Sequence, residues 1–396
     1  MDTRNATAAL MVLVSCGAAV AQVADEGRAF ASELRADAMA RTSLLDQGGA
    51  AAFAPKVSGF VLARYNINAR TDSNLDANNN KTTMGGQLAY TKLQITGNIY
   101  SDAWGYGIQF KFGEGDGLAV LDDAYGVFKP EDQWQIKWGQ FKPTLMREEN
   151  ISDTKQLSAN RSVMNSVFTQ SRTQGVQFMF TGDSIRFTGC FNDGIRTANV
   201  DFTGATEADY GFTGRLDYKW DGEWKQFDEF TSFPDSKYFG AAGLSAHYQN
   251  GGKTVATNDV EIFEGVGDVM VKGNGWNVYG AVVLKENNGA TAQTFLDWGF
   301  ILQGGYFIRP QWELFARFDS VIPDTDRATN DSFNTLTFGA NKYISPNSHA
   351  IKLTLDLEWF LSKQSQSIAG QSTLTGLLAS SKSNEFAIQA QLQLMF

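Results

Sequence analysis

The last eleven residues of the chain, Phe386–Phe396, alternate between apolar and polar side chains. Every second residue counted back from Phe396 is apolar, and the residues between them are small or polar apart from Met395. A repeat of two indicates a β-strand whose two faces differ. A tilted strand of roughly 9–11 residues can cross a bilayer with its apolar face toward lipid and its polar face inward. The last strand of a soluble β-sandwich is the alternative.

The same alternation predicts sixteen strands in residues 56–396. They lie near 57–66, 84–99, 104–112, 118–129, 133–141, 173–181, 184–191, 209–220, 237–249, 259–272, 275–286, 295–308, 311–319, 333–343, 349–361 and 384–396. In the strand 209–220, for example, the aromatic and leucine side chains fall on one face and Arg215, Asp217 and Lys219 on the other. Polar faces this charged cannot all pack in a dry core, so we expect a water-filled lumen. Sixteen strands are enough to enclose one.

The gaps between the predicted strands alternate between long and short. The gaps 66–83 and 141–172 are long, whereas 101–103 is short. Short turns at one end of the barrel and long loops at the other are typical of a membrane barrel. An even number of strands places both the first and the last residue of the barrel on the periplasmic side. Two gaps break the pattern, because 113–117 is shorter and 221–236 is longer than it requires.

Composition agrees with an all-β fold, a 16-stranded antiparallel transmembrane β-barrel with a short N-terminal helical segment. Hydrophobic residues make up 43%, the mean hydropathy is −0.26, and beyond the N-terminus no stretch reaches the roughly 18 apolar residues of a spanning helix. With 33 Lys and Arg against 43 Asp and Glu, the net charge of −10 argues against nucleic acid as a partner. It also cautions against assuming a strongly positive pore.

Residues 1–21 fit a secretory signal peptide, because an apolar stretch follows Arg4 and Ala19-Val20-Ala21 precedes the predicted cleavage site. A competing lipoprotein cleavage box, Leu13-Val14-Ser15-Cys16, would lipidate Cys16. Cleavage after Ala21 leaves Cys190 as the single cysteine, so no disulfide within the chain is expected.

Residues 22–55 are predicted to be a periplasmic helical segment and linker before the barrel of 56–396. Apolar spacing predicts a short helix near 24–46, which would oligomerise or sit in the barrel mouth. A flexible tether is an equal alternative, since Gly27 weakens the helix.

The long gap after the fifth strand is the most specific stretch. It reads Gly139-Gln140-Phe141-Lys142-Pro143, then Arg161-Ser162, then Arg172-Thr173-Gln174-Gly175-Val176-Gln177. These motifs resemble those of the phosphate-selective porin O and P family, and so does the strand plan of 56–396. The resemblance implies a trimeric channel in which residues 142–172 fold inward as a constriction loop. A plain surface loop is the alternative, although loops this long in compact domains are usually functional.

Anion selection in a pore requires Lys and Arg side chains along its wall, and the planar guanidinium of Arg can bind phosphate oxygens in pairs. From their strand faces, the wall is predicted to contribute Lys92, Lys137, Arg186 and Arg215. The constriction loop is predicted to contribute Lys142, Arg147, Arg161 and Arg172, which we expect at the narrowest part. Acidic residues on the same faces leave only a mildly positive balance. Each single charge has the alternative of pairing with an opposite charge on the next strand.

Enzymatic chemistry has little support in the sequence. His247 and His349 each stand alone, Cys190 has no partner at ligand spacing, and no phosphate-binding glycine loop or nucleophile elbow occurs. We expect no catalytic residue, metal or cofactor.

The sequence therefore predicts a porin of the bacterial outer membrane for passive diffusion of small solutes, with anions such as phosphate preferred. A barrel enzyme, an adhesin, or a non-selective or cation-preferring porin is the alternative. The expected partners are small anions, outer-membrane lipid, further copies in a homotrimer, and the barrel-assembly machinery, which the family resemblance implies would recognise Phe396.

Overall fold

The computed structural model describes residues 55–71, 81–113, 117–204, 207–251, 260–288, 294–363, 377 and 382–396. The signal peptide, the lipidation site at Cys16 and the helix near 24–46 that the sequence predicts lie outside the described residues. Within the described residues, no helix is both long enough and apolar enough to span a membrane.

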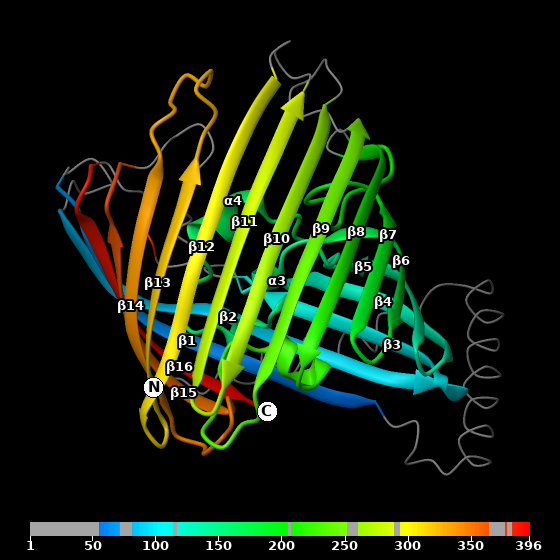
Figure 1. Ribbon diagram of the computed structural model, residues 1–396, viewed down its shortest axis with the longest axis horizontal. Coiled ribbons are helices and arrows are strands. Elements are labelled where there is room, and N and C mark those ends of the chain that lie inside the picture. The colour runs from blue at the N-terminus through cyan, green and yellow to red at the C-terminus, as the bar shows by residue number, and fades with distance from the viewer. Residues whose placement is uncertain are drawn as a thin grey trace, which may run out of the picture. The chain divides into compact units, whose positions relative to one another are not determined.

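Sixteen antiparallel strands form a closed barrel, in which β16 pairs with β1 to complete the ring (Figure 1). Their bounds are β1 Lys56–Ala69, β2 Thr82–Ile99, β3 Ser101–Phe112, β4 Ala119–Glu131, β5 Trp134–Phe141, β6 Thr173–Thr181, β7 Ile185–Asn192, β8 Ala208–Asp221, β9 Phe239–Gly251, β10 Glu261–Gly273, β11 Trp276–Asn288, β12 Thr294–Arg309, β13 Trp312–Ile322, β14 Phe333–Tyr343, β15 Ile351–Phe360 and β16 Glu385–Met395. Each overlaps one predicted strand, so the predicted fold class is confirmed.

The two faces of the strands carry the side chains that the alternation predicts. On β15, Leu353 and Leu355 point outward and are 43% and 55% exposed, whereas Lys352 and Asp356 point inward and are 1% and 2% exposed. Outward apolar side chains can face lipid at no cost in desolvated polar groups. The strand period therefore fixes which residues reach the interior.

The barrel has two different ends. At the end where β1 begins and β16 ends, called the terminal end here, the turns 132–133 and 274–275 are short, but the connection 222–238 is long and holds the 3₁₀ helix η3 (Trp224–Asp228). At the opposite end, the loop end, residues 142–172 connect β5 to β6. This segment, called the inner loop, holds α3 (Arg147–Asn150), the 3₁₀ helix η2 (Asp153–Lys155) and α4 (Val163–Phe168). Figure 1 shows α3 and α4 inside the ring of strands.

The interior is not water-filled throughout, which corrects the expectation from the sequence. Nearly every inward side chain of β9–β16 is buried, and apolar residues of the inner loop form a core with the wall. The expectation failed because it assumed that the charged wall faces could meet only one another. In the structure, those side chains find hydrogen-bond partners in segments that fold into the lumen.

The inner loop leaves the wall at a glycine whose backbone no other residue tolerates well. Gly139 has φ +117°, and a Cβ there would lie 2.3 Å from the carbonyl oxygen of Ala124 on β4. It pairs in register with Gly175 on β6, so both motif glycines sit where the loop departs. Because β4 and β5 approach each other closely at this point, only a residue without a side chain fits between them.

We expect Gly139→Ala to destabilise the folded barrel by roughly 1–3 kcal/mol, because it adds both a strained backbone angle and an overlap. Thermal unfolding in detergent measures the change. Gly86→Ala is the matched control, since its nearest atom would be the carbonyl oxygen of Arg64 at 3.9 Å. Equal unfolding temperatures for the two variants would show that β4 yields to the added atom.

Candidate functional site

The Gly-Gln-Phe-Lys-Pro motif sends the chain inward at the end of β5. The Gln140 side chain donates to the carbonyl of Asp122 at 2.9 Å and accepts from the backbone N–H of Asn199 at 2.7 Å. Phe141 is completely buried. Gln140 thereby ties β5 to β4 and to the loop 193–207, and the chain turns into the lumen at Lys142.

The Arg161-Ser162 pair closes the inner loop on itself. The buried Glu148 carboxylate accepts from the Ser162 backbone N–H at 2.7 Å and hydroxyl at 2.6 Å, while Ser162 Oγ caps α4 by accepting from the Asn165 N–H at 2.9 Å. The Arg161 guanidinium donates to the carbonyls of Glu148 at 3.1 Å and Ile151 at 2.7 Å. The motif therefore fixes the loop's shape as well as its charge.

The barrel wall holds the loop backbone through polar side chains of neighbouring strands. On β15, Asp356 accepts from the Ala159 N–H at 2.8 Å and Lys352 donates to the Gln156 carbonyl at 2.8 Å. Further contacts come from β13, β14, β16 and β1, through Arg317, Asn341, Gln389 and Arg64. Because these five strands are consecutive in the ring, one side of the wall anchors the loop.

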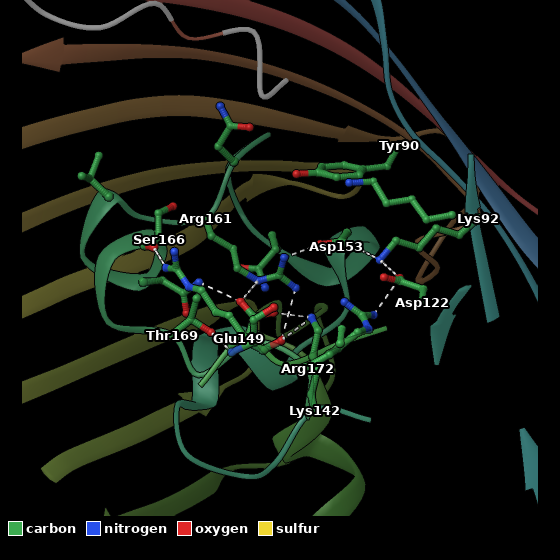
Figure 2. Close-up of a pocket in the computed structure, with 18 of the residues that line it drawn as sticks. Tyr90, Lys92, Asp122, Lys142, Glu149, Asp153, Arg161, Ser166, Thr169 and Arg172 are labelled. Atoms are coloured by element: carbon green, nitrogen blue, oxygen red, sulfur yellow. Dashed lines mark hydrogen bonds and ion pairs between the residues drawn. The ribbon is translucent and has the colours of Figure 1, made fainter. Parts of the chain in front are cut away.

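On its other side, the inner loop faces β2–β4 across a cavity of about 550 Å³. Figure 2 shows Tyr90 and Lys92 of β2 and Asp122 of β4 opposite Glu149 and Arg161 of the loop. The lining of this cavity includes six cations and three acids. The cations are Lys92, Lys111, Lys142, Arg161, Arg172 and Arg196, and the acids are Asp122, Glu149 and Asp153. The formal charge of the lining is therefore +3, in a chain whose net charge is −10.

The charges of the cavity are linked into a chain of ion pairs from the loop to the wall. The Lys92 ammonium lies 3.0 Å from Asp153 of the loop and 2.8 Å from Asp122 of β4. Arg172 contacts Asp122 at 2.7 Å and Asp123, just outside the lining, at 2.8 Å. Arg161 contacts Asp153 as well. Each of the three acids of the lining is thus shared between two cations, and the lining keeps a net positive charge.

Glu149 and Asp153 stay ionised at neutral pH although only 12% and 10% of their side chains is exposed. Burial opposes ionisation of Glu149, but Lys142 and Arg161 outweigh it and lower its pKa to about 2. Burial also disfavours the charged form of Asp153, yet Arg161 and Lys92 hold its pKa well below the usual value. Burial lowers the pKa of Lys142 to about 8, and Glu149 offsets this only in part. Lys142 therefore loses its charge just above neutral pH.

The eight cations predicted from the sequence fall into three places. Four line the cavity: Lys92, Lys142, Arg161 and Arg172. Lys137 and Arg186 lie on the inner wall closer to the terminal end and stack on aromatic rings, Lys137 at 4.0 Å from the Tyr125 ring centroid and Arg186 at 4.5 Å from that of Trp224.

Arg147 and Arg215 do not line the cavity. They share Asp217 and Asp268 in a buried cluster, with the Arg147 guanidinium 2.6 Å from Asp217 and that of Arg215 2.7 Å from Asp268. Arg147 also lies 3.3 Å from the centre of the Phe227 ring. Both charges are balanced, and the structure places Arg147 in this cluster and not in the lining of the cavity.

Arg196 and Tyr90 were not among the candidates from the sequence, although both line the cavity. Arg196 belongs to the loop 193–207, whose polar composition gave no sign of its place. Among the described residues, no group of three or more His, Cys, Asp or Glu side chains could hold a metal ion.

Comparison with known proteins places the fold. The family described as phosphate-selective porin O and P matches residues 63–396, whereas no curated protein matches the chain. The chain is similar in structure to an anion-selective porin from Comamonas acidovorans, with a TM-score of 0.58 and 10% identity over 87% of this chain and 99% of that one.

Two further structures resemble the chain over 87% of its length. The outer-membrane channel DcaP of Acinetobacter baumannii has a TM-score of 0.57 and 13% identity, with 98% of its own chain covered. A trimer form of OmpT from Vibrio cholerae has a TM-score of 0.56 and 8% identity, with all of its chain covered. At these identities, the likeness establishes the fold.

Proposed function

The chain belongs to the phosphate-selective porin O and P family, and we propose that its channel prefers small anions and filters them at the cavity beside the inner loop. As a member of that family, with a closed sixteen-strand barrel, it is a porin of the bacterial outer membrane through which small solutes pass. We propose that the protein conducts solutes and has no catalytic role.

The charge of the cavity carries this proposal. An ion inside a narrow passage responds to the charges a few ångströms away, because water and salt screen more distant ones beyond about 8 Å at physiological ionic strength. A lining of +3 therefore outweighs the acidic total of the chain. Phosphate fits the arginine-bearing lining, and the structural neighbour described as an anion-selective porin agrees with this direction.

A passage with little charge preference is the second candidate. Asp123 favours this candidate. It contacts Arg172 at 2.8 Å, and counting it with the lining lowers the positive charge of the cavity. The two candidates differ in the reversal potential under a salt gradient, which is displaced from zero in the anion direction for the first candidate and lies near zero for the second.

Three partners are proposed with the channel. The trimer form of the Vibrio cholerae neighbour supports a homotrimer. Exposed apolar side chains around the barrel suit outer-membrane lipid. Phe396 is 68% exposed as a residue, and its backbone pairs with Gly59 at 2.8 and 3.0 Å, so we propose that the barrel-assembly machinery recognises this aromatic end.

We expect the wild-type channel to be anion-selective in planar bilayers, and the double variant Lys111→Gln with Arg196→Gln to shift its reversal potential toward cations. The change lowers the lining from +3 to +1 without touching the ion pairs of Lys92, Arg161 or Arg172. At about 8 Å and an effective dielectric constant of about 40, each charge alters the energy of an ion by about 1 kcal/mol.

The matched control is Lys129→Gln with Lys237→Gln, which removes two exposed cations that do not line the cavity. The reversal potential of this control is expected to equal that of the wild type. A cation-selective wild type, or equal shifts in both double variants, would refute the proposed filter.

The anion preference is expected to fall as the pH rises from 7 to 9. Lys142 has a pKa of about 8, so it loses its charge across this range and the lining drops by one unit. Reversal potentials at a fixed salt gradient measure the effect. Lys142→Gln should remove the step near pH 8 and start from the weaker preference, and a step that persists in this variant would assign it to another group.

Deleting Phe396 is expected to lower the amount of barrel in the outer membrane and to leave export to the periplasm unchanged. The deletion removes the exposed aromatic residue and its backbone pair with Gly59. Cell fractionation measures both pools. Phe386→Ala is the control, because Phe386 is another outward aromatic of β16, 37% exposed, but is not terminal. Normal surface levels of the deletion variant would contradict the expectation.

A further inference from the structure

A second segment folds into the barrel, from the terminal end. It comprises residues 222–238 between β8 and β9 and is called the crossbar below. A helical turn, η3, starts it, and the Glu223 and Gln226 side chains cap that turn reciprocally. Neighbouring turns at this end, such as 182–184 and 274–275, hold only two or three residues.

The crossbar reaches from one side of the ring to the other. Trp224 Nε1 donates to the carbonyl of Gly182, in the turn between β6 and β7, at 2.7 Å. The Glu229 carboxylate lies 2.9 Å from His349 Nε2, in the turn between β14 and β15. In a closed ring of sixteen strands, these two turns are eight strands apart and therefore lie on opposite sides.

Several contacts fix the far end of the crossbar. The Thr231 and Tyr343 hydroxyls are 2.8 Å apart, and the Lys272 ammonium donates to the Glu229 carbonyl at 2.6 Å. The Phe233 ring packs edge-on against that of Tyr343, with the centroids 5.0 Å apart. The segment is thus anchored on β10 and β14 and is not a free turn.

The inward side of the crossbar joins the apolar underside of the inner loop. Phe227 and Phe230 are 0% and 1% exposed, and the Phe230 ring lies 5.0 Å from that of Tyr279 on β11. They belong to one buried cluster with loop residues such as Leu145 and Met146. At Gly299 on β12, a Cβ would lie 2.6 Å from the Phe168 ring, so α4 packs directly on the wall.

Solvent reaches the two halves of the inner wall unequally. Inward side chains of β9–β16 are buried almost throughout, and Met270 of β10 is 1% exposed. On β2–β5, by contrast, inward residues such as Gln94, Lys111 and Gln135 remain half-buried and in contact with solvent. The cavity beside the inner loop lies on this second side.

We propose that the crossbar and the inner loop together form a septum that seals the β9–β16 half of the lumen, so that solutes pass only along the β2–β5 wall. The crossbar is then an element that sets the size of the passage. The inference rests on the channel activity and not on its charge preference. A channel without anion preference would leave it intact, because its test reads access of water to the two walls.

The test compares single cysteines on the two walls, in a background in which Cys16 and Cys190 are both changed to Ser. Met270→Cys probes the sealed half and Gln135→Cys the open half. A small water-soluble methanethiosulfonate reagent is added to both compartments, and labelling rates are measured on the folded barrel. We expect Gln135→Cys to react at least tenfold faster than Met270→Cys.

Replacing residues 222–238 by Asn-Gly, a turn that suits a two-residue hairpin, should raise the rate at Met270→Cys at least tenfold and change that at Gln135→Cys less than twofold. Should this chain not fold, Phe230→Ala provides a milder opening, expected to raise the Met270→Cys rate several-fold. Tyr238→Ala is its control, an exposed aromatic of the same segment.

Two outcomes overturn the proposal. Equal rates at the two cysteines in the intact barrel would mean that water fills both halves. An unreactive Met270→Cys in a folded barrel without the crossbar, or with Phe230→Ala, would mean that the inner loop alone makes the seal.

Discussion

The need to satisfy polar groups inside the barrel is the constraint on which the rest of the structure depends. A strand that alternates faces in a membrane directs half of its side chains inward, and a buried polar group without a partner costs about 1–3 kcal/mol. Asp356, Lys352 and Asn341 meet this requirement by binding the backbone of the inner loop. Since these partners are backbone groups, the wall holds the chain of the inner loop even though the loop contains only short helices.

The same constraint separates structural charges from those available to a solute. In the filled part of the lumen, Arg147 and Arg215 share one buried cluster with Asp217 and Asp268, so two cations meet two acids. Where the wall faces the cavity, cations outnumber acids by three. An unbalanced charge is tolerated there because water and passing ions can solvate it, whereas in the dry half it would carry a large desolvation penalty. Charge preference therefore arises from the distribution of the charges and not from their total.

The sequence was sufficient to predict the strands and their faces. The pleat directs successive side chains of every strand to opposite faces, and the bilayer requires the outward face to be apolar. It could not separate Arg147 from Arg161. Both lie in one loop that also carries acidic residues, and their different places depend on which acid each meets in the fold, Asp217 of β8 for Arg147 and Asp153 of the loop for Arg161. Such pairings join residues far apart in the chain, for instance Arg147 with Asp217, and no local pattern encodes them.

The crossbar shows the same limit of prediction from local sequence. Its length was visible as a gap that broke the alternation of turns and loops, but its place inside the lumen depends on contacts between Trp224 and Gly182 and between Glu229 and His349. A loop that enters from one end can cover the inner wall of β9–β13 only to the depth it reaches. Its lower apolar surface would then face water, unless a second segment met it from the opposite end. Phe227 and Phe230 supply that surface, so the two insertions stabilise each other through a shared dry core, and neither insertion is expected to keep its shape without the other.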